Sequence, residues 1–154
     1  MVFKEAQSQS PATSGLAGHA DSQTATTSHG GQPVLIVEDD SAIRESLAQM
    51  LREEGYAVTM ARDGIEALRL LAEARERYVI FLDVLMPRMD GVEFCERLLA
   101  DPALRHDHAI ILMSAWFHHS AAIPAVAAAH LYKPFDIETV LELAQRFSVS
   151  TPSH

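Results

Sequence analysis

The sequence predicts an α/β fold in which a parallel sheet carries helices on both faces. Short apolar runs typical of buried strands alternate with segments whose apolar residues recur at helical spacing. This strand-then-helix alternation occurs five times, which is the pattern of a parallel sheet joined by right-handed crossovers. A further observation is that acidic, hydroxyl and lysine side chains come directly after several of the apolar runs.

Composition limits the function classes. The chain has 154 residues, of which 48% are apolar, so one globular domain with a substantial core is expected. A formal net charge of −9 argues against direct nucleic acid binding and against binding to an anionic membrane surface. No apolar run approaches the roughly 20 residues of a membrane span, and no signal peptide is evident. We therefore expect a soluble, cytoplasmic protein, and we expect its single cysteine, Cys95, to be an inert buried thiol.

The chain divides into three regions. Residues 1–32 are rich in Ser, Gln, Thr, Gly and His, and they have too few large apolar residues to offset the entropy cost of ordering. We predict a disordered N-terminal tail over 1–32, one globular domain over 33–148, and a flexible C-terminus over 149–154.

The first half of the domain contains two strands and two helices. Residues 34–37 are a buried strand, and Ser41 can cap the next helix. Gly55 ends this helix, whose apolar face is formed by Ile43, Leu47, Met50 and Leu51. A short strand over 56–61, a turn at Asp63-Gly64 and a helix to about Arg75 complete this half.

The central strand is the run Tyr78 to Leu82, which is ended by Asp83. Pro87 cannot continue a strand ladder or a helix interior, and Asp90-Gly91 has the chemistry of a turn that enters a helix. The face of that helix carries Val92, Cys95, Leu98 and Leu99.

The last part of the domain is less regular. Residues 109–113 are a buried strand that ends at Ser114. The segment 116–130 contains Pro124 and an alanine-rich piece over 125–129, so it admits at most a short helix. A brief strand over 131–132 ends at Lys133, and Asp136 can cap a final helix.

The polar groups at the strand ends are Glu38, Asp39, Asp83, Ser114 and Lys133. The carboxyl ends of parallel strands share one edge of the sheet, so these groups can converge there. Three neighbouring carboxylates repel one another unless a cation neutralises them, and an all-oxygen ligand set suits Mg²⁺. A lysine and a hydroxyl are the groups that a phosphoryl group requires for charge neutralisation and hydrogen bonding.

Four motifs in this order, VLIVEDD, FLDVLMPRMDG, LMSA and YKPF, resemble the receiver domain of two-component response regulators. The resemblance covers about residues 33–147. It implies a flavodoxin-like (βα)5 three-layer sandwich with the strand order 2-1-3-4-5. Because the segment between Ser114 and Lys133 is shorter than is usual in the family, we expect a shortened fourth helix.

The resemblance also implies site roles. Asp83 matches the aspartate that a histidine kinase or a histidine phosphotransfer protein phosphorylates. Glu38 and Asp39 match the acidic pair that binds Mg²⁺, and Leu85 matches the residue whose backbone carbonyl completes the metal ligands.

The remaining roles concern the phosphoryl group and the switch. Ser114 matches the hydroxyl residue that hydrogen-bonds the phosphoryl group, and Lys133 matches the lysine that pairs with it. Pro134 comes after a peptide bond that is usually cis in the family. His130 falls at the switch position, which is usually aromatic and turns inward when Ser114 moves.

The resemblance therefore implies a phosphoacceptor switch, and the chain is expected to be a stand-alone receiver that signals by binding another protein or by relaying phosphate. It is not expected to be an enzyme beyond self-phosphorylation and slow self-dephosphorylation, and a monomer or weak homodimer is expected.

One alternative is a phosphorylation-independent adaptor. Another is a haloacid-dehalogenase-like phosphatase, which is disfavoured because Leu85 stands where that family needs a second acid. A transition-metal site is also disfavoured, because no firm ligand spacing joins the candidate histidines, His106, His108, His118 and His119.

Overall fold

The computed structural model describes residues 32–115 and 125–148. The predicted tail, apart from Gln32, and the predicted C-terminal segment lie outside the described residues. The domain boundaries at 33 and 148 therefore stay predictions.

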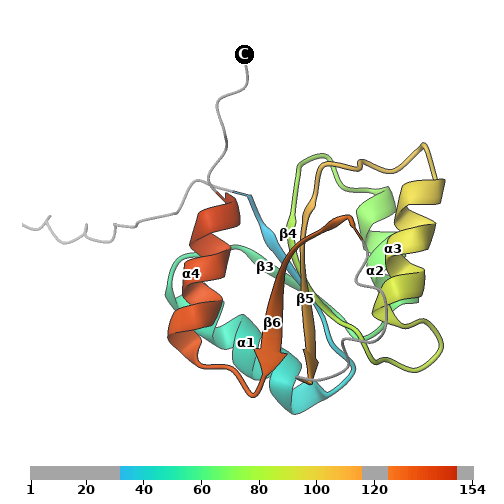
Figure 1. Cartoon of the computed structure of the whole chain (residues 1–154). Helices are drawn as coiled ribbons and strands as arrows, with labels where there is room; N and C mark the ends of the chain where they lie inside the picture. Colours follow the sequence, from blue (N-terminus) through green and yellow to red (C-terminus); the bar gives the residue numbers. More distant parts are fainter. Residues whose placement is uncertain (1–31, 116–124, 149–154) are drawn as a thin grey trace, which may run out of the picture. The chain divides into compact units, whose positions relative to one another are not determined.

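A five-stranded parallel sheet forms the centre of the domain (Figure 1). Its strand order is β3-β2-β4-β5-β6, which in chain order is 2-1-3-4-5, so the predicted topology is confirmed. The strands are β2 (Val34–Val37), β3 (Val58–Ala61), β4 (Val79–Asp83), β5 (Ala109–Ala115) and β6 (Ala127–Lys133).

Four helices of the described chain cover the two faces of the sheet. Helices α1 (Ser41–Glu53) and α4 (Ile137–Ser148) lie on one face, and α2 (Gly64–Ala72) and α3 (Gly91–Ala100) lie on the other (Figure 1). The result is the predicted three-layer sandwich, with an apolar core on each side of the sheet.

Strand β4 is buried along its whole length because it contributes to both cores. Ile80 and Leu82 pack toward α2 and α3, whereas Val79 and Phe81 pack toward α1 and α4. All four side chains are fully buried. This explains why the strand reads as a continuous apolar run rather than as an alternating one.

Aspartates cap the helices that start next to the C-terminal edge of the sheet. Asp63, Asp90 and Asp136 each accept a backbone N–H three residues further on, from Glu66, Glu93 and Thr139 respectively. For α1 the cap is Asp40 rather than Ser41. Asp40 is the N-cap and accepts from the backbone N–H groups of Ala42 and Ile43, because Asp40 has the extended backbone conformation that a cap needs, whereas Ser41 is already helical.

Several predicted boundaries also need correction; strand β3, for example, begins at Val58 rather than at residue 56. Helix α2 ends at Ala72 rather than near Arg75, because the chain tightens into turns in which Glu73 and Ala74 donate to carbonyls three residues back. Strand β6 spans seven residues rather than two. Its alanines 127–129, predicted as part of at most a short helix, belong to the strand that pairs with β5, and a register shift between Ile110 and Ile111 accommodates them.

The predicted shortened fourth helix would fall between β5 and β6. Residues 116–124 of this segment, including Pro124, lie outside the described residues, so the prediction stays open for them. Among the described helices, none combines the length and the apolarity that crossing a membrane requires.

His108 lies at the N-terminal edge of the sheet, beside the start of β5. It is buried, and its Nδ1 accepts a hydrogen bond of 2.9 Å from the backbone N–H of Tyr78. Burial lowers the pKa of His108 to about 4, because a charged ring would be desolvated there. Protonation would also put a hydrogen on Nδ1 and remove the bond from Tyr78.

This predicts a specific pH dependence of stability. The folded pKa of His108 lies below its unfolded value near 6.5, so between about pH 6.5 and 4 the unfolded chain binds more protons. The free energy of unfolding should therefore fall as the pH decreases through this window, with His108 contributing up to roughly 3 kcal/mol. Urea denaturation of the wild type and of His108→Leu at several pH values measures this fall in the free energy of unfolding. An equally steep fall in the free energy of unfolding of the variant would contradict the attribution of this pH dependence to His108.

Candidate functional site

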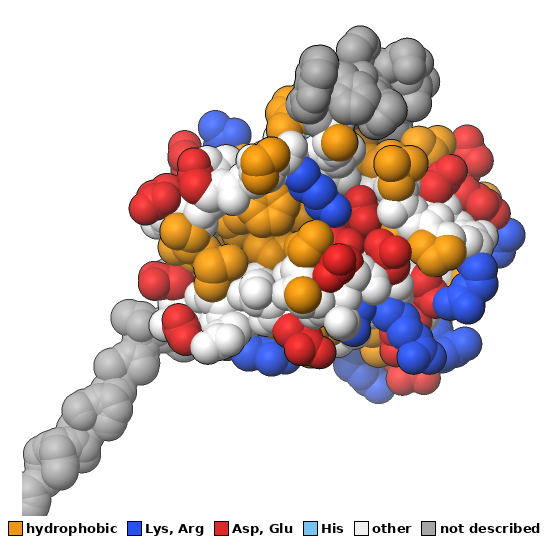
Figure 2. All heavy atoms as spheres, turned by 90° about the horizontal axis from the view of Figure 1, so that it is seen from below, with side chains coloured by type: hydrophobic (Ala, Val, Ile, Leu, Met, Phe, Trp, Pro, Cys, Tyr) orange, Lys and Arg blue, Asp and Glu red, His pale blue; other side chains and the backbone are white. Residues whose placement is uncertain are grey.

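The C-terminal edge of the sheet gathers polar side chains. Figure 2 shows this edge, where acidic side chains cluster beside a hollow with a hydrophobic floor. Strands β2, β4, β5 and β6 all end here, because parallel strands point the same way.

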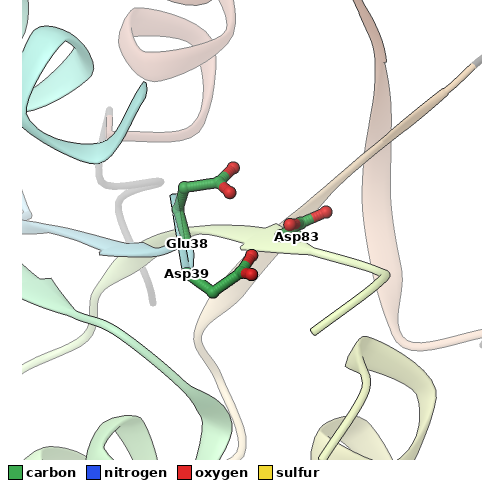
Figure 3. A group of neighbouring side chains, drawn as sticks. All are labelled: Glu38, Asp39 and Asp83. Atoms are coloured by element: carbon green, nitrogen blue, oxygen red, sulfur yellow. The ribbon is translucent and has the colours of Figure 1, made fainter. Parts of the chain in front are cut away.

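Three carboxylates lie together at this edge (Figure 3). Glu38 and Asp39 come directly after β2, and Asp83 is the last residue of β4. One oxygen from each of the three groups lies within 4.8 Å of the others. Glu38 is 1% exposed and Asp83 is 4% exposed, whereas Asp39 is exposed to solvent. Two of the three negative charges are therefore withdrawn from water.

Hydrogen bonds from neighbouring residues hold Glu38 and Asp83 in place. The Asp40 N–H donates to Glu38 Oε2 at 3.1 Å, and the Leu85 N–H donates to Asp83 Oδ1 at 3.3 Å. Arg44, from the first turn of α1, donates through Nη1 to the carbonyl oxygen of Glu38 at 2.8 Å. Each of these contacts joins the acid cluster to a turn or helix that starts at the sheet edge.

Lys133 brings a positive charge to the cluster from the end of β6. Its Nζ lies 3.0 Å from Glu38 Oε1 and 3.5 Å from Asp83 Oδ1. The peptide bond between Lys133 and Pro134 is cis, as the resemblance implied. The lysine thus bridges the two buried carboxylates.

The negative charges of the cluster outnumber the positive charge that Lys133 supplies. Burial, and next the negative charge of Glu38, raise the pKa of Asp83 to about 7, although Lys133 opposes the shift. For Lys133, burial disfavours the charged form, but the hydrogen bond from Nζ to Glu38 and the charges of Asp83 and Glu38 outweigh it and raise its pKa. One lysine cannot neutralise three carboxylates.

The residues present fit a divalent cation of the Mg²⁺ type. They supply only carboxylate oxygens, which are hard ligands, and a charge of +2 would complete the neutralisation that Lys133 begins. Leu85 is 60% exposed, and the ligand role that the resemblance implies for its backbone carbonyl stays a prediction.

Ser114 and His130 form a second polar pair near this edge. Ser114, near the end of β5, is 5% exposed, and its Oγ lies 2.8 Å from His130 Nε2 on β6. The His130 ring stacks on Tyr132, with ring centroids 4.5 Å apart. The two residues thus join the end of β5 to the middle of β6.

The loop after Asp83 is held by contacts that the sequence did not reveal. A Cβ on Gly91 would lie 2.9 Å from Val84 Cα and 3.0 Å from Asp83 O, so only glycine allows this close approach. Arg88, which has a φ of 69°, forms an ion pair with Asp63 at the start of α2. The pair joins residues 25 positions apart in the chain, and no local pattern indicates such a contact.

The histidines considered for a transition-metal site do not join the cluster. His108 bonds to Tyr78, and His106 Nε2 lies 2.9 Å from the carbonyl oxygen of Asp101. His118 and His119 lie outside the described residues. Cys95 is buried as expected, and burial raises its pKa to about 11.

The crowding of buried carboxylates predicts that the site destabilises the metal-free fold. Because the folded pKa of Asp83 lies above its unfolded value, its stability contribution is lost as the pH rises from about 4 to 7. At pH 8 without divalent metal, Asp83→Asn should raise the free energy of unfolding by roughly 1–3 kcal/mol. Mg²⁺ should stabilise the wild type more than the variant.

Thermal denaturation with EDTA or with Mg²⁺ measures both effects. Asp136→Asn is a suitable control, because Asp136 is an exposed helix cap outside the acid cluster. Equal stabilisation of Asp83→Asn and the wild type by Mg²⁺ would contradict a metal site at Asp83.

Known proteins are similar to this chain in sequence and in fold. The family model described as "Response regulator receiver domain" matches residues 34–145. The response regulator MprA from Mycobacterium sp. (strain KMS) is 42% identical over 111 residues, which cover 70% of this chain and 46% of that protein. The chain thus matches about half the length of such curated relatives.

Solved structures agree with the sequence matches. A CheY-like receiver domain protein from Methanospirillum hungatei JF-1 is 28% identical with a TM-score of 0.69, covering 76% of this chain and 94% of that one. The response regulator TrrA from Thermotoga maritima, solved in complex with Mg(2+)-BeF, is 29% identical with a TM-score of 0.66, covering 75% and 98%. Fold, motif order and sequence identity agree, and the chain belongs to the response regulator receiver domain family.

Proposed function

We propose that Asp83 is the phosphoacceptor of this receiver domain and that its phosphorylation changes a surface that binds a partner protein. The observation that carries the proposal is the placement of the Asp83 carboxylate. It ends a buried strand, lies 3.5 Å from the ammonium group of Lys133, and shares a candidate metal-binding cluster with Glu38 and Asp39.

The transfer step is consistent with this geometry. An oxygen of the Asp83 carboxylate attacks the phosphorus atom of a phosphohistidine, a new O–P bond forms, and the P–N bond breaks. The donor imidazole leaves with the electron pair and takes a proton from solvent. A carboxylate is a weak nucleophile, so the site acts by positioning and charge neutralisation rather than by base catalysis.

The neighbouring side chains have distinct proposed roles. Glu38, Asp39, Asp83 and the Leu85 carbonyl would hold Mg²⁺, which, when bound, supplies positive charge next to the transferring phosphoryl oxygens. Lys133 reaches Asp83 from the side of β6 and would pair with another of these oxygens. Ser114 would donate its hydroxyl hydrogen to a third.

The cycle is completed by loss of the phosphoryl group. Water attacks phosphorus, the O–P bond to Asp83 breaks, and inorganic phosphate leaves while the carboxylate is restored. The chain would thus act only on its own Asp83, and its product is a conformational signal rather than a released metabolite.

Phosphorylation by a small-molecule donor tests the proposal. With phosphoramidate and Mg²⁺, the full chain should gain the mass of one phosphoryl group, and the gain should disappear in Asp83→Asn and in EDTA. Lys133→Met should slow the gain by at least roughly tenfold, because the phosphoryl group loses the lysine that contacts Asp83. Intact-mass spectrometry over time measures each rate.

Asp90→Asn is the matched control, because Asp90 comes after the same strand but caps α3 at the surface. It should be phosphorylated like the wild type. A folded wild-type protein that gains no phosphoryl group, together with a partner that binds equally to wild type and Asp83→Asn, would instead support the phosphorylation-independent adaptor.

The proposed phosphoryl donor is a histidine kinase or a histidine phosphotransfer protein, and a groove beside the site suits its docking. The groove has a volume of about 530 Å³ and is mostly apolar. Helix α1 contributes Ala42, Ile43, Ser46, Leu47 and Met50, and the chain at the end of β6 contributes Lys133, Pro134 and Phe135. Lys133 lines the groove and also contacts Asp83, so the groove opens onto the acid cluster. In Figure 2 the hydrophobic hollow lies beside the acidic patch.

An apolar helix of the donor that lies in this groove would hold its phosphohistidine next to Asp83. Ile43→Gln should therefore slow transfer from a purified phosphohistidine protein by roughly tenfold, since it removes apolar contact area. Phosphorylation by phosphoramidate should not change. Phosphotransfer from radiolabelled donor protein measures the first rate, and intact-mass spectrometry measures the second.

Ile65→Gln is the control, because Ile65 is 42% exposed on α2 and does not line the groove. If Ile43→Gln and Ile65→Gln slowed protein-donor transfer equally, the groove would not be the docking site.

A further inference from the structure

The hydrogen bond between Ser114 and His130 has a direction that the geometry can assign. His130 lies opposite Leu112 in the sheet register, and Ser114 lies opposite Tyr132, so the side chains of Ser114 and His130 share one face of the sheet. Ser114 Oγ lies 2.8 Å from Nε2, and the ring is stacked on Tyr132 with an interplanar angle of 17°. The stack holds the ring with Nε2 toward the serine.

The other ring nitrogen identifies the tautomer. Burial lowers the pKa of His130, so at neutral pH the ring is uncharged and carries one N–H. Nδ1 is buried and has no hydrogen-bond partner within residues 32–115 and 125–148. A hydrogen on Nδ1 would be a buried donor without an acceptor, which is rarer in proteins than an unpaired acceptor. The favoured tautomer carries its hydrogen on Nε2.

This tautomer decides the role that Ser114 can take. A hydroxyl has one hydrogen to donate and two lone pairs that accept. If Nε2–H donates to Oγ, the serine hydrogen stays available. In the part of the chain that the structure describes, His130 is the one hydrogen-bond partner of Ser114 Oγ, so the hydrogen is not engaged elsewhere there.

We propose that His130 is a positioning residue for phosphoryl transfer: its Nε2–H donates to Ser114 Oγ and leaves the single serine hydrogen for a phosphoryl oxygen on Asp83. The proposal rests on the proposed function of Asp83. It also gives the histidine a role that an apolar aromatic ring cannot fill, because such a ring has no N–H. In the opposite tautomer the serine hydrogen would point at the ring, and that bond would have to break before Ser114 could bind the phosphoryl group.

The kinetic test compares two variants of His130 in the full chain. His130→Phe keeps a stacking ring without the donor, whereas the terminal amide of His130→Gln can replace Nε2–H. With phosphoramidate and saturating Mg²⁺, the maximal phosphorylation rate should fall roughly three- to tenfold in His130→Phe and should be largely restored in His130→Gln. The phosphoramidate concentration at half-maximal rate should not change. Tyr132→Phe, which keeps the stack, should match the wild type.

A double-mutant cycle separates positioning from a general structural role. In a Ser114→Ala background, His130→Phe should cause no additional loss, because the histidine acts only through the serine hydroxyl. An equal loss in both backgrounds, or a wild-type rate for His130→Phe, would overturn the proposal.

Nuclear magnetic resonance on the unphosphorylated wild type tests the tautomer without any substitution. Two-bond ¹H–¹⁵N correlations of the imidazole should show hydrogen on Nε2 of His130 and none on Nδ1. Hydrogen on Nδ1 would overturn the proposal even if Asp83 is phosphorylated normally. A folded wild type that no phosphodonor phosphorylates at Asp83 would overturn the proposed function and, with it, this role of His130.

Discussion

The burial of two carboxylates against one lysine is the constraint on which the site depends. Glu38 and Asp83 are almost completely removed from water, and Lys133 contacts both of them. Negative charge at this density is unfavourable unless it is compensated, and the raised pKa of Asp83 expresses that cost. A site of this kind is suited to accept a cation that offsets this negative charge.

The rest of the edge maintains this arrangement. Helix caps at Asp40, Asp63 and Asp90 satisfy the first backbone N–H groups of α1, α2 and α3, which start beside the strand ends. The close approach of Gly91 to the backbone of Asp83 fixes where the loop after β4 leaves the sheet. The acid cluster is thus supported by ordinary capping and turn chemistry around it.

The polar pair of Ser114 and His130 gives the site a second connection to the outer strand. It extends from the end of β5 to β6, whose other side chains are partly or fully exposed except for Leu131. A change at Asp83 that engages Ser114 would therefore reach the edge of the sheet through one hydrogen bond and one ring stack.

The sequence by itself determined the fold class, and it marked Glu38, Asp39, Asp83, Ser114 and Lys133 as candidate site residues, whereas the strand order was implied only by the family resemblance. It could do so because buried parallel strands read as apolar runs and place the residues after them on one edge. It did not determine the length of β6, since alanines 127–129 carry no strand signal and join the strand only because β5 offers them hydrogen bonds. Nor did it reveal the Arg88–Asp63 ion pair, the Arg44 contact to Glu38, or the Ser114–His130 bond. These contacts join side chains from different elements, so only the tertiary structure decides which of them meet.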